Sequence, residues 1–220
     1  IWLQNQKPQE ALNVLDEAGK VSSVGPEFLI GLAELYANFS LQVPVQAEVA
    51  RTRGQAVLGR VGQDKITDPQ LRLRLADAYN LLGNDAQAAK LYQDLLQRLP
   101  DVPFVRESVR AKLADIYLRS NDHKCAIEIL ESIIRDNPTD TQAYLLLGGI
   151  AYDDGNYPEA VDYFNKVVLL DPGQERAYYH LARAQIGQQK ADDALATLER
   201  ARAKFPPGFL LEQLTALACS

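Results

Sequence analysis

The chain has 220 residues, of which 47% are hydrophobic and 24% charged, so wholesale disorder is excluded, and its apolar runs are too short to span a bilayer. Its 23 basic and 29 acidic residues give a net charge of -6, and we expect no nucleic-acid partner because nucleic-acid binders normally present a basic face. Cys125 and Cys219 form neither a disulfide framework nor a metal-ligand pattern. The sequence is compatible with the cytoplasm and with the bacterial cell envelope or periplasm.

Few side chains are suited to catalysis. His123 and His180 are the two histidines, and neither lies in a metal-binding spacing. Glycine motifs that bind phosphates or dinucleotides are missing, and no set of nucleophile, base and orienting group can be assembled. We therefore predict that the chain is not an enzyme and that it holds no metal and no cofactor.

A fixed period runs through residues 69–208. Three columns recur with spacings of 38, 34 and 34 residues: a proline, an alanine, and a leucine followed by a small residue. The columns are Pro100, Pro138, Pro172 and Pro206; Ala88, Ala126, Ala160 and Ala194; and Leu75-Ala76, Leu113-Ala114, Leu147-Gly148 and Leu181-Ala182. A constant period of this length is typical of stacked structural repeats.

Each repeat is predicted to contain two helices joined by a short turn. In residues 69–106, Leu75, Ala76 and Tyr79 share one helical face, and Ala88 and Tyr92 share another. The turn residues 83–85 lie between the two faces. The small residues permit close approach of the helices, and the proline column ends each second helix because its ring prevents continuation.

The predicted segments follow in chain order. Residues 1–25 are the end of a truncated unit, in which Trp2 and Ala11 keep the register of the repeats. Residues 26–68 form a degenerate unit whose second helix, around 45–61, is lengthened. Four repeats occupy 69–106, 107–140, 141–174 and 175–208, the first with four extra residues within 101–106. Residues 209–220 begin a further or capping helix.

The repeat of 141–174 has the most complete pattern: Tyr144, Leu147, Gly148, Tyr152, Gly155, Tyr157, Ala160, Phe164 and Pro172. This pattern resembles the 34-residue pattern of the tetratricopeptide repeat (TPR) family, with Ala151 in place of a usual tyrosine. In the next repeat Gln185 replaces that tyrosine. The resemblance implies an all-α fold, a right-handed superhelix of stacked antiparallel helix pairs, whose first helices line a concave groove.

Both ends of the sequence are expected to be cut. The chain has no methionine, and Ile1 falls within a helix by register. Residues 209–220 have four leucines, at 210, 211, 214 and 217, and no second helix after them. Because burying a leucine contributes about 1.5–3 kcal/mol, we expect self-association through this helix.

The resemblance implies that the array binds a partner peptide or helix in its concave groove. We therefore predict a non-catalytic protein-protein interaction scaffold. The alternative is a docking or regulatory portion of a larger enzyme or of a cell-envelope export or assembly protein. The partner is a protein or peptide whose identity the fold does not supply.

First-helix residues that are not needed for packing form two candidate surfaces. Tyrosine and arginine often anchor interfaces, so we expect binding between the last two full repeats, although a plain solvated surface is equally compatible. This candidate groove comprises Leu146, Gly149, Tyr152, Arg176, Tyr179, His180 and Arg183. A secondary groove comprises Arg74, Asp77, Lys112 and Asp115. There the pairs 74/77 and 112/115 are expected as i, i+3 ion pairs of a solvated helix.

Overall fold

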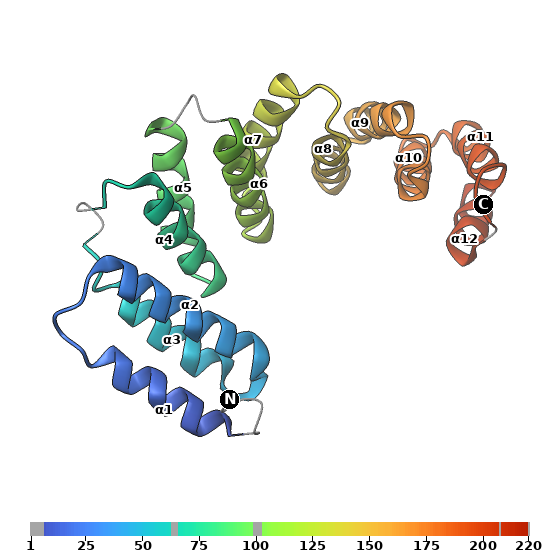
Figure 1. Ribbon diagram of the computed structural model, residues 1–220. Coiled ribbons are helices and arrows are strands. Elements are labelled where there is room, and N and C mark those ends of the chain that lie inside the picture. Colours follow the sequence, from blue (N-terminus) through green and yellow to red (C-terminus); the bar gives the residue numbers. More distant parts are fainter. Residues whose placement is uncertain (1–6, 63–65, 99–102, 207, 220) are drawn as a thin grey trace. The chain divides into compact units, whose positions relative to one another are not determined.

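The structure is a computed structural model that describes residues 7–62, 66–98, 103–206 and 208–219. These residues form twelve α-helices, one short 3-10 helix and no strand (Figure 1). The chain divides into two units, residues 1–109 and 110–220, and the division falls inside α6 (Pro103–Arg119). The predicted all-α fold is confirmed. Trp2 and Pro100, used in the sequence register, lie outside the described residues.

The first unit contains α1 (Pro8–Gly19), α2 (Pro26–Gln42), the 3-10 helix η1 (Pro44–Gln46), α3 (Ala47–Leu58), α4 (Pro69–Leu81) and α5 (Asp85–Arg98). Helix α1 packs on α2 and α3, while α4 packs on α2, α3 and α5. Prolines begin α1, α2 and α4, where the missing N–H has no helical partner to lose.

The lengthened second helix predicted for residues 26–68 is wrong. Helix α3 has 12 residues, whereas the first helix α2 has 17, so the added turn belongs to the first helix. Pro44 explains the difference, because the residue before a proline is driven out of helical conformation and Val43 has φ -126° and ψ 77°. Val45, expected inside the second helix, lies in η1 and is 96% exposed.

The four extra residues within 101–106 lengthen a first helix. Helix α6 begins at Pro103 and has 17 residues, whereas the equivalent helices α4 and α8 have 13. Four residues make about one turn of α-helix. The repeat predicted to start at 107 therefore has its first helix starting one turn earlier.

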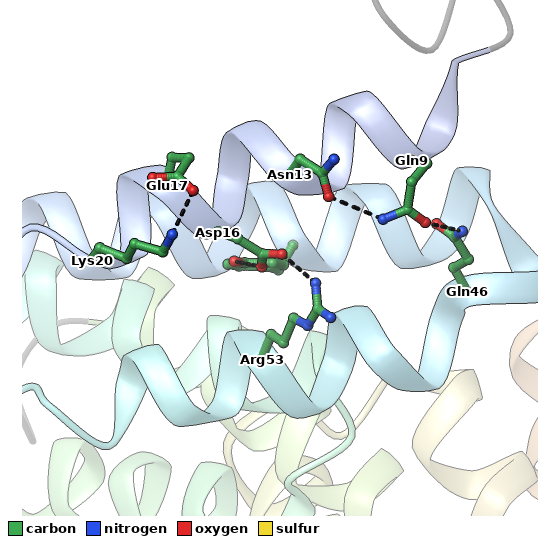
Figure 2. Close-up of polar contacts among 8 residues, drawn as sticks. Gln9, Asn13, Asp16, Glu17, Lys20, Gln46 and Arg53 are labelled. Atoms are coloured by element: carbon green, nitrogen blue, oxygen red, sulfur yellow. Dashed lines mark hydrogen bonds and ion pairs between the residues drawn. The ribbon is translucent and has the colours of Figure 1, made fainter.

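Helix α1 is attached largely by polar contacts. Leu12 is its one buried residue. The carboxylate of Asp16 accepts a hydrogen bond from the Tyr36 hydroxyl at 2.8 Å and pairs with Arg53 of α3 (Figure 2). Burial and this carboxylate raise the pKa of Tyr36 above its usual 10, so the phenol remains a donor. Arg60 donates at 2.5 Å to two carbonyls at the end of α1.

The second unit contains the C-terminal part of α6, then α7 (His123–Asp136), α8 (Thr141–Asp153), α9 (Tyr157–Leu170), α10 (Glu175–Gly187), α11 (Ala191–Arg202) and α12 (Phe209–Ala218). Helix α10 contacts α8 and α9 on one side and α11 and α12 on the other. Figure 1 shows α8, α10 and α12 in one layer and α9 and α11 in a second layer. The first helices thus share one layer.

Small residues allow the helices to approach, as predicted. Ala76, Ala88 and Ala160 are completely buried. A Cβ atom added at Gly148 would lie 2.6 Å from the Phe164 ring, well inside van der Waals contact. The helix pair α8/α9 therefore requires glycine at 148, and the aromatic ring fills the space that a side chain would take.

Gln185, which replaces the usual tyrosine, is 8% exposed. Its buried side-chain amide would destabilise the fold if it had no hydrogen-bond partner. Thr197 of α11 donates a hydrogen bond to its side-chain oxygen at 2.9 Å. The threonine is also buried, at 3% exposure. The two side chains form a matched polar pair inside the α10/α11 interface.

We expect the Thr197→Val variant to lower the free energy of unfolding by about 1–3 kcal/mol, because the buried Gln185 amide loses its donor. The double variant Gln185→Leu, Thr197→Val should recover most of that loss, since both partners become apolar. Urea unfolding of the two single variants and the double variant measures this coupling. Additive losses would contradict the paired arrangement.

The turns between first and second helices share one backbone geometry. Gly83, Asn121, Gly155 and Gln189 all have positive φ, at 77°, 57°, 75° and 61°. In each turn the next residue donates its N–H to the carbonyl five positions earlier, at 2.8–2.9 Å. This is the Schellman motif, in which a left-handed residue ends a helix. The turn predicted at residues 83–85 is confirmed.

A glycine should suit all four positions, because a left-handed conformation costs an L-residue about 1–2 kcal/mol. We therefore expect Gln189→Gly to raise the free energy of unfolding by about 0.5–1 kcal/mol and Gly155→Ala to lower it by about 1 kcal/mol. Urea denaturation midpoints of the two variants give the comparison. Shifts of the same sign would show that the turn conformation does not govern stability.

Candidate functional site

Helix α8 presents half of the predicted groove. Asp140 starts the helix by accepting the N–H of Ala143 at 2.9 Å. Ala143, Leu147, Gly148, Ile150 and Ala151 are buried in the core. Leu146, Gly149 and Tyr152, spaced by three residues, lie on the opposite side and are half-buried. No atom lies within 4 Å of a Cβ added at Gly149, so the middle of this surface is open.

Helix α10 presents the other half. It is packed on both sides, and seven of its residues are buried: Ala177, Tyr178, Tyr179, Leu181, Ala182, Ala184 and Gln185. What remains accessible is a narrow stripe of Arg176, His180 and Arg183, at positions i, i+4 and i+7. All three residues were predicted to line the groove.

Tyr179 was also predicted to line the groove, and this is wrong. Its side chain is 6% exposed, and its hydroxyl donates to Glu175 at 2.5 Å. Burial, assisted by this hydrogen bond, raises its pKa to about 12. Tyr179 lies on a side of α10 that packs against neighbouring helices. The sequence analysis assumed that only one face of each first helix is packed, so it did not include this contact.

The two halves meet at Tyr152 and Arg183. The guanidinium carbon of Arg183 lies 4.8 Å from the centre of the Tyr152 ring, which is cation–π geometry. Tyr157 contacts the same ring edge-on, at 5.4 Å between centroids. The arginine is thereby held in place by an aromatic face.

His180 is half-buried and stacks on Phe164, with ring centroids 5.2 Å apart and planes inclined by 22°. Burial lowers the pKa of His180 below its usual 6.5, and the positive charges of Arg183 and Arg176 lower it further. The imidazole therefore stays neutral at pH 7.

A pocket of about 320 Å³ opens on the other side of α8. Its walls include Ala111, Asp115 and Leu118 of α6, Leu130 and Ile133 of α7, and Leu146 of α8. The volume lies at the lower end of those found for ligand pockets and admits one or two apolar side chains. Sequence reasoning placed Leu146 and Asp115 on the groove surface, but the pocket itself depends on the α7 side chains beneath it.

The secondary-groove residues do not form the predicted i, i+3 pairs. Arg74 instead makes a two-point contact with Glu34 of α2, at 3.0 and 2.7 Å. Asp77 accepts the Tyr92 hydroxyl at 2.5 Å. Asp115 pairs with Arg119, an i+4 neighbour, in place of the expected Lys112. Contacts to another helix thus replace the first pairing, which local spacing cannot reveal.

Helix α12 packs against α10 and α11 through Leu211, Leu214 and Ala218. Phe209, Leu210 and Leu217 remain 81%, 44% and 54% exposed. Self-association through 209–220 stays a prediction.

None of the described helices is long and apolar enough to cross a membrane. Within the same residues, no three acidic, histidine or cysteine side chains gather in a way that could hold a metal ion.

Three profiles of the tetratricopeptide repeat match residues 70–101, 111–175 and 151–217, more than half of the chain together. The chain belongs to the tetratricopeptide repeat family. TPR proteins are typically non-catalytic scaffolds, and membership supports a role in protein interaction.

Solved TPR structures share the fold. MamA AMB-1 is 19% identical, with a TM-score of 0.59 over 82% of this chain and 96% of that chain. MamA 41-end from Desulfovibrio magneticus RS-1 is 20% identical, with a TM-score of 0.56 over 78% of this chain and 93% of that chain. At this identity the likeness shows the helical-repeat fold alone.

The position of His180 makes stability depend on pH. In the unfolded chain the imidazole takes up a proton near pH 6.5, whereas the folded chain resists protonation until lower pH. The unfolded state therefore binds more protons below pH 6.5, and the free energy of unfolding falls as the solution is acidified.

NMR titration of the His180 ring should give a pKa below 6.5. The His180→Gln variant should lose less stability between pH 7 and pH 5, and a native ring pKa at or above 6.5 would contradict the stacked, buried environment.

Proposed function

We propose that this TPR protein is a non-catalytic scaffold that binds a segment of a partner protein across α6, α8 and α10 of its second unit. The observation that carries the proposal is the apolar pocket between α6 and α8. Leu146 belongs both to this pocket and to the α8 surface that leads past Gly149 to Tyr152. One continuous face thus offers an apolar anchor point and an aromatic–arginine contact.

The chemistry of this face suits peptide recognition. Buried anchors in pockets contribute most of the energy of many interfaces, and tyrosine and arginine are frequent among the dominant contacts. Gly149 leaves room for a backbone to pass close to α8. To act as a scaffold, the chain has only to present a rigid, preformed surface.

The pocket can be filled without disturbing the core, because Ala111 is exposed and lines it. We expect Ala111→Phe to weaken recovery of peptides from a phage-displayed library of random linear dodecapeptides by at least about tenfold. Ala196→Phe on α11 is the matched control, because Ala196 is also helical and exposed but lies outside the pocket. Thermal unfolding by circular dichroism checks that both variants fold. Equal recovery by the native chain and by Ala111→Phe would refute the proposed site.

A further inference from the structure

The two arginines of the α10 stripe have no acidic partner. Arg176 and Arg183 are exposed, and neither makes a hydrogen bond or ion pair with another described residue. Elsewhere in the unit, Arg110, Arg119 and Arg202 pair with Asp136, Asp115 and Glu199. The chain has a net charge of -6, so these two cations form a local positive stripe on one helical face.

Arg176 also lies where a cation is unfavourable. It is the second residue of α10, in the first turn, where the helix dipole repels positive charge by about 0.3–1 kcal/mol. Arg135 and Arg200, for which no ion pair is seen either, lie in the last turns of α7 and α11, where the dipole attracts cations. Helix stability explains the latter two arginines but not Arg176.

The carboxylate next to Arg176 in sequence is engaged with another group. Glu175 accepts a hydrogen bond from the Tyr179 hydroxyl at 2.5 Å. Arg183 lies over the Tyr152 ring, and this contact holds the guanidinium while its N–H groups stay able to donate. The stripe therefore offers two arginine donors to an external anion, and the aromatic ring holds one of them in place.

We propose that the α8/α10 face binds an acidic segment of a partner protein, whose carboxylates pair with Arg176 and Arg183 while an apolar side chain enters the α6/α8 pocket. This inference rests on the proposed function and specifies the chemistry of the partner. Arg176 and Arg183 are seven positions apart in sequence, which corresponds to about 10 Å along the helix. In an extended polyproline II segment, side chains three residues apart lie on one side about 9 Å apart, so two acids at i and i+3 match the spacing. The net charge of -6 favours such a peptide over nucleic acid, whose many phosphates it would repel.

The experiment uses the full chain and the same dodecapeptide library, displayed through the peptide C terminus so that no free terminal carboxylate is present. Peptides recovered by the native chain should be enriched in Asp and Glu three residues apart. Charge reversal by Arg176→Glu, Arg183→Glu should shift the enrichment to Lys and Arg. The control Lys124→Glu, Arg135→Glu changes the net charge equally at exposed positions of α7 and should keep the acidic preference.

Affinity of a synthetic, amide-capped version of the most enriched acidic peptide provides the quantitative test. Each of Arg176→Gln and Arg183→Gln should weaken binding about tenfold, because each removes a charge-assisted hydrogen bond. Enriched peptides that lose binding in Ala111→Phe but show no acidic preference would overturn this inference and leave the proposed function standing. Failure of Ala111→Phe to affect recovery, or failure to recover any peptide, would overturn both. A single-stranded oligonucleotide that binds more tightly than the peptide, and depends on the same arginines, would also overturn it.

Discussion

The close contact between α8 and α9 is the constraint on which the proposed binding face depends. Gly148 has no side chain, so the Phe164 ring packs directly against the α8 backbone. The same ring stacks on His180 of α10. One buried aromatic ring thus sets the distance from α8 to α9 and the position of α10. A larger residue at 148 would displace Phe164, and with it the stripe of α10 that carries the two arginines.

Packing on both sides explains why the accessible part of α10 is so narrow. A helix buried on one face has about half of its circumference available for other contacts, whereas α10 contacts helices before and after it in the chain. Its accessible residues are therefore confined to one line along the helix. In the proposed complex the charges on that line act on one ligand, and the lowered pKa of His180 keeps the position between the arginines neutral.

The repeat columns predicted most of the helices because each column records a packing requirement that is met within about 34 residues. Small residues at 76, 88, 148 and 160 and the turn at 83–85 could be read directly from the sequence. The burial of Tyr179 could not, because it depends on which sides of α10 meet other helices. The partner of Arg74 could not either, since Glu34 lies 40 residues away and on another helix. The end of α2 could not be predicted from the sequence pattern. That pattern is compatible with helix both before and after Pro44, and the proline overrides it.

The attachment of α1 has a consequence for how the first unit opens. One fully buried leucine, several half-buried residues, the hydrogen bond and ion pair of Asp16, and hydrogen bonds from Arg60 hold this helix, whereas α2 buries eight residues. Exposed charge pairs weaken as ionic strength rises, but apolar burial does not. Amide hydrogens of α1 should therefore exchange with solvent earlier than those of α2, and the difference should widen in salt. Helix α1 would then behave as a separately melting segment whose attachment responds to the ionic environment.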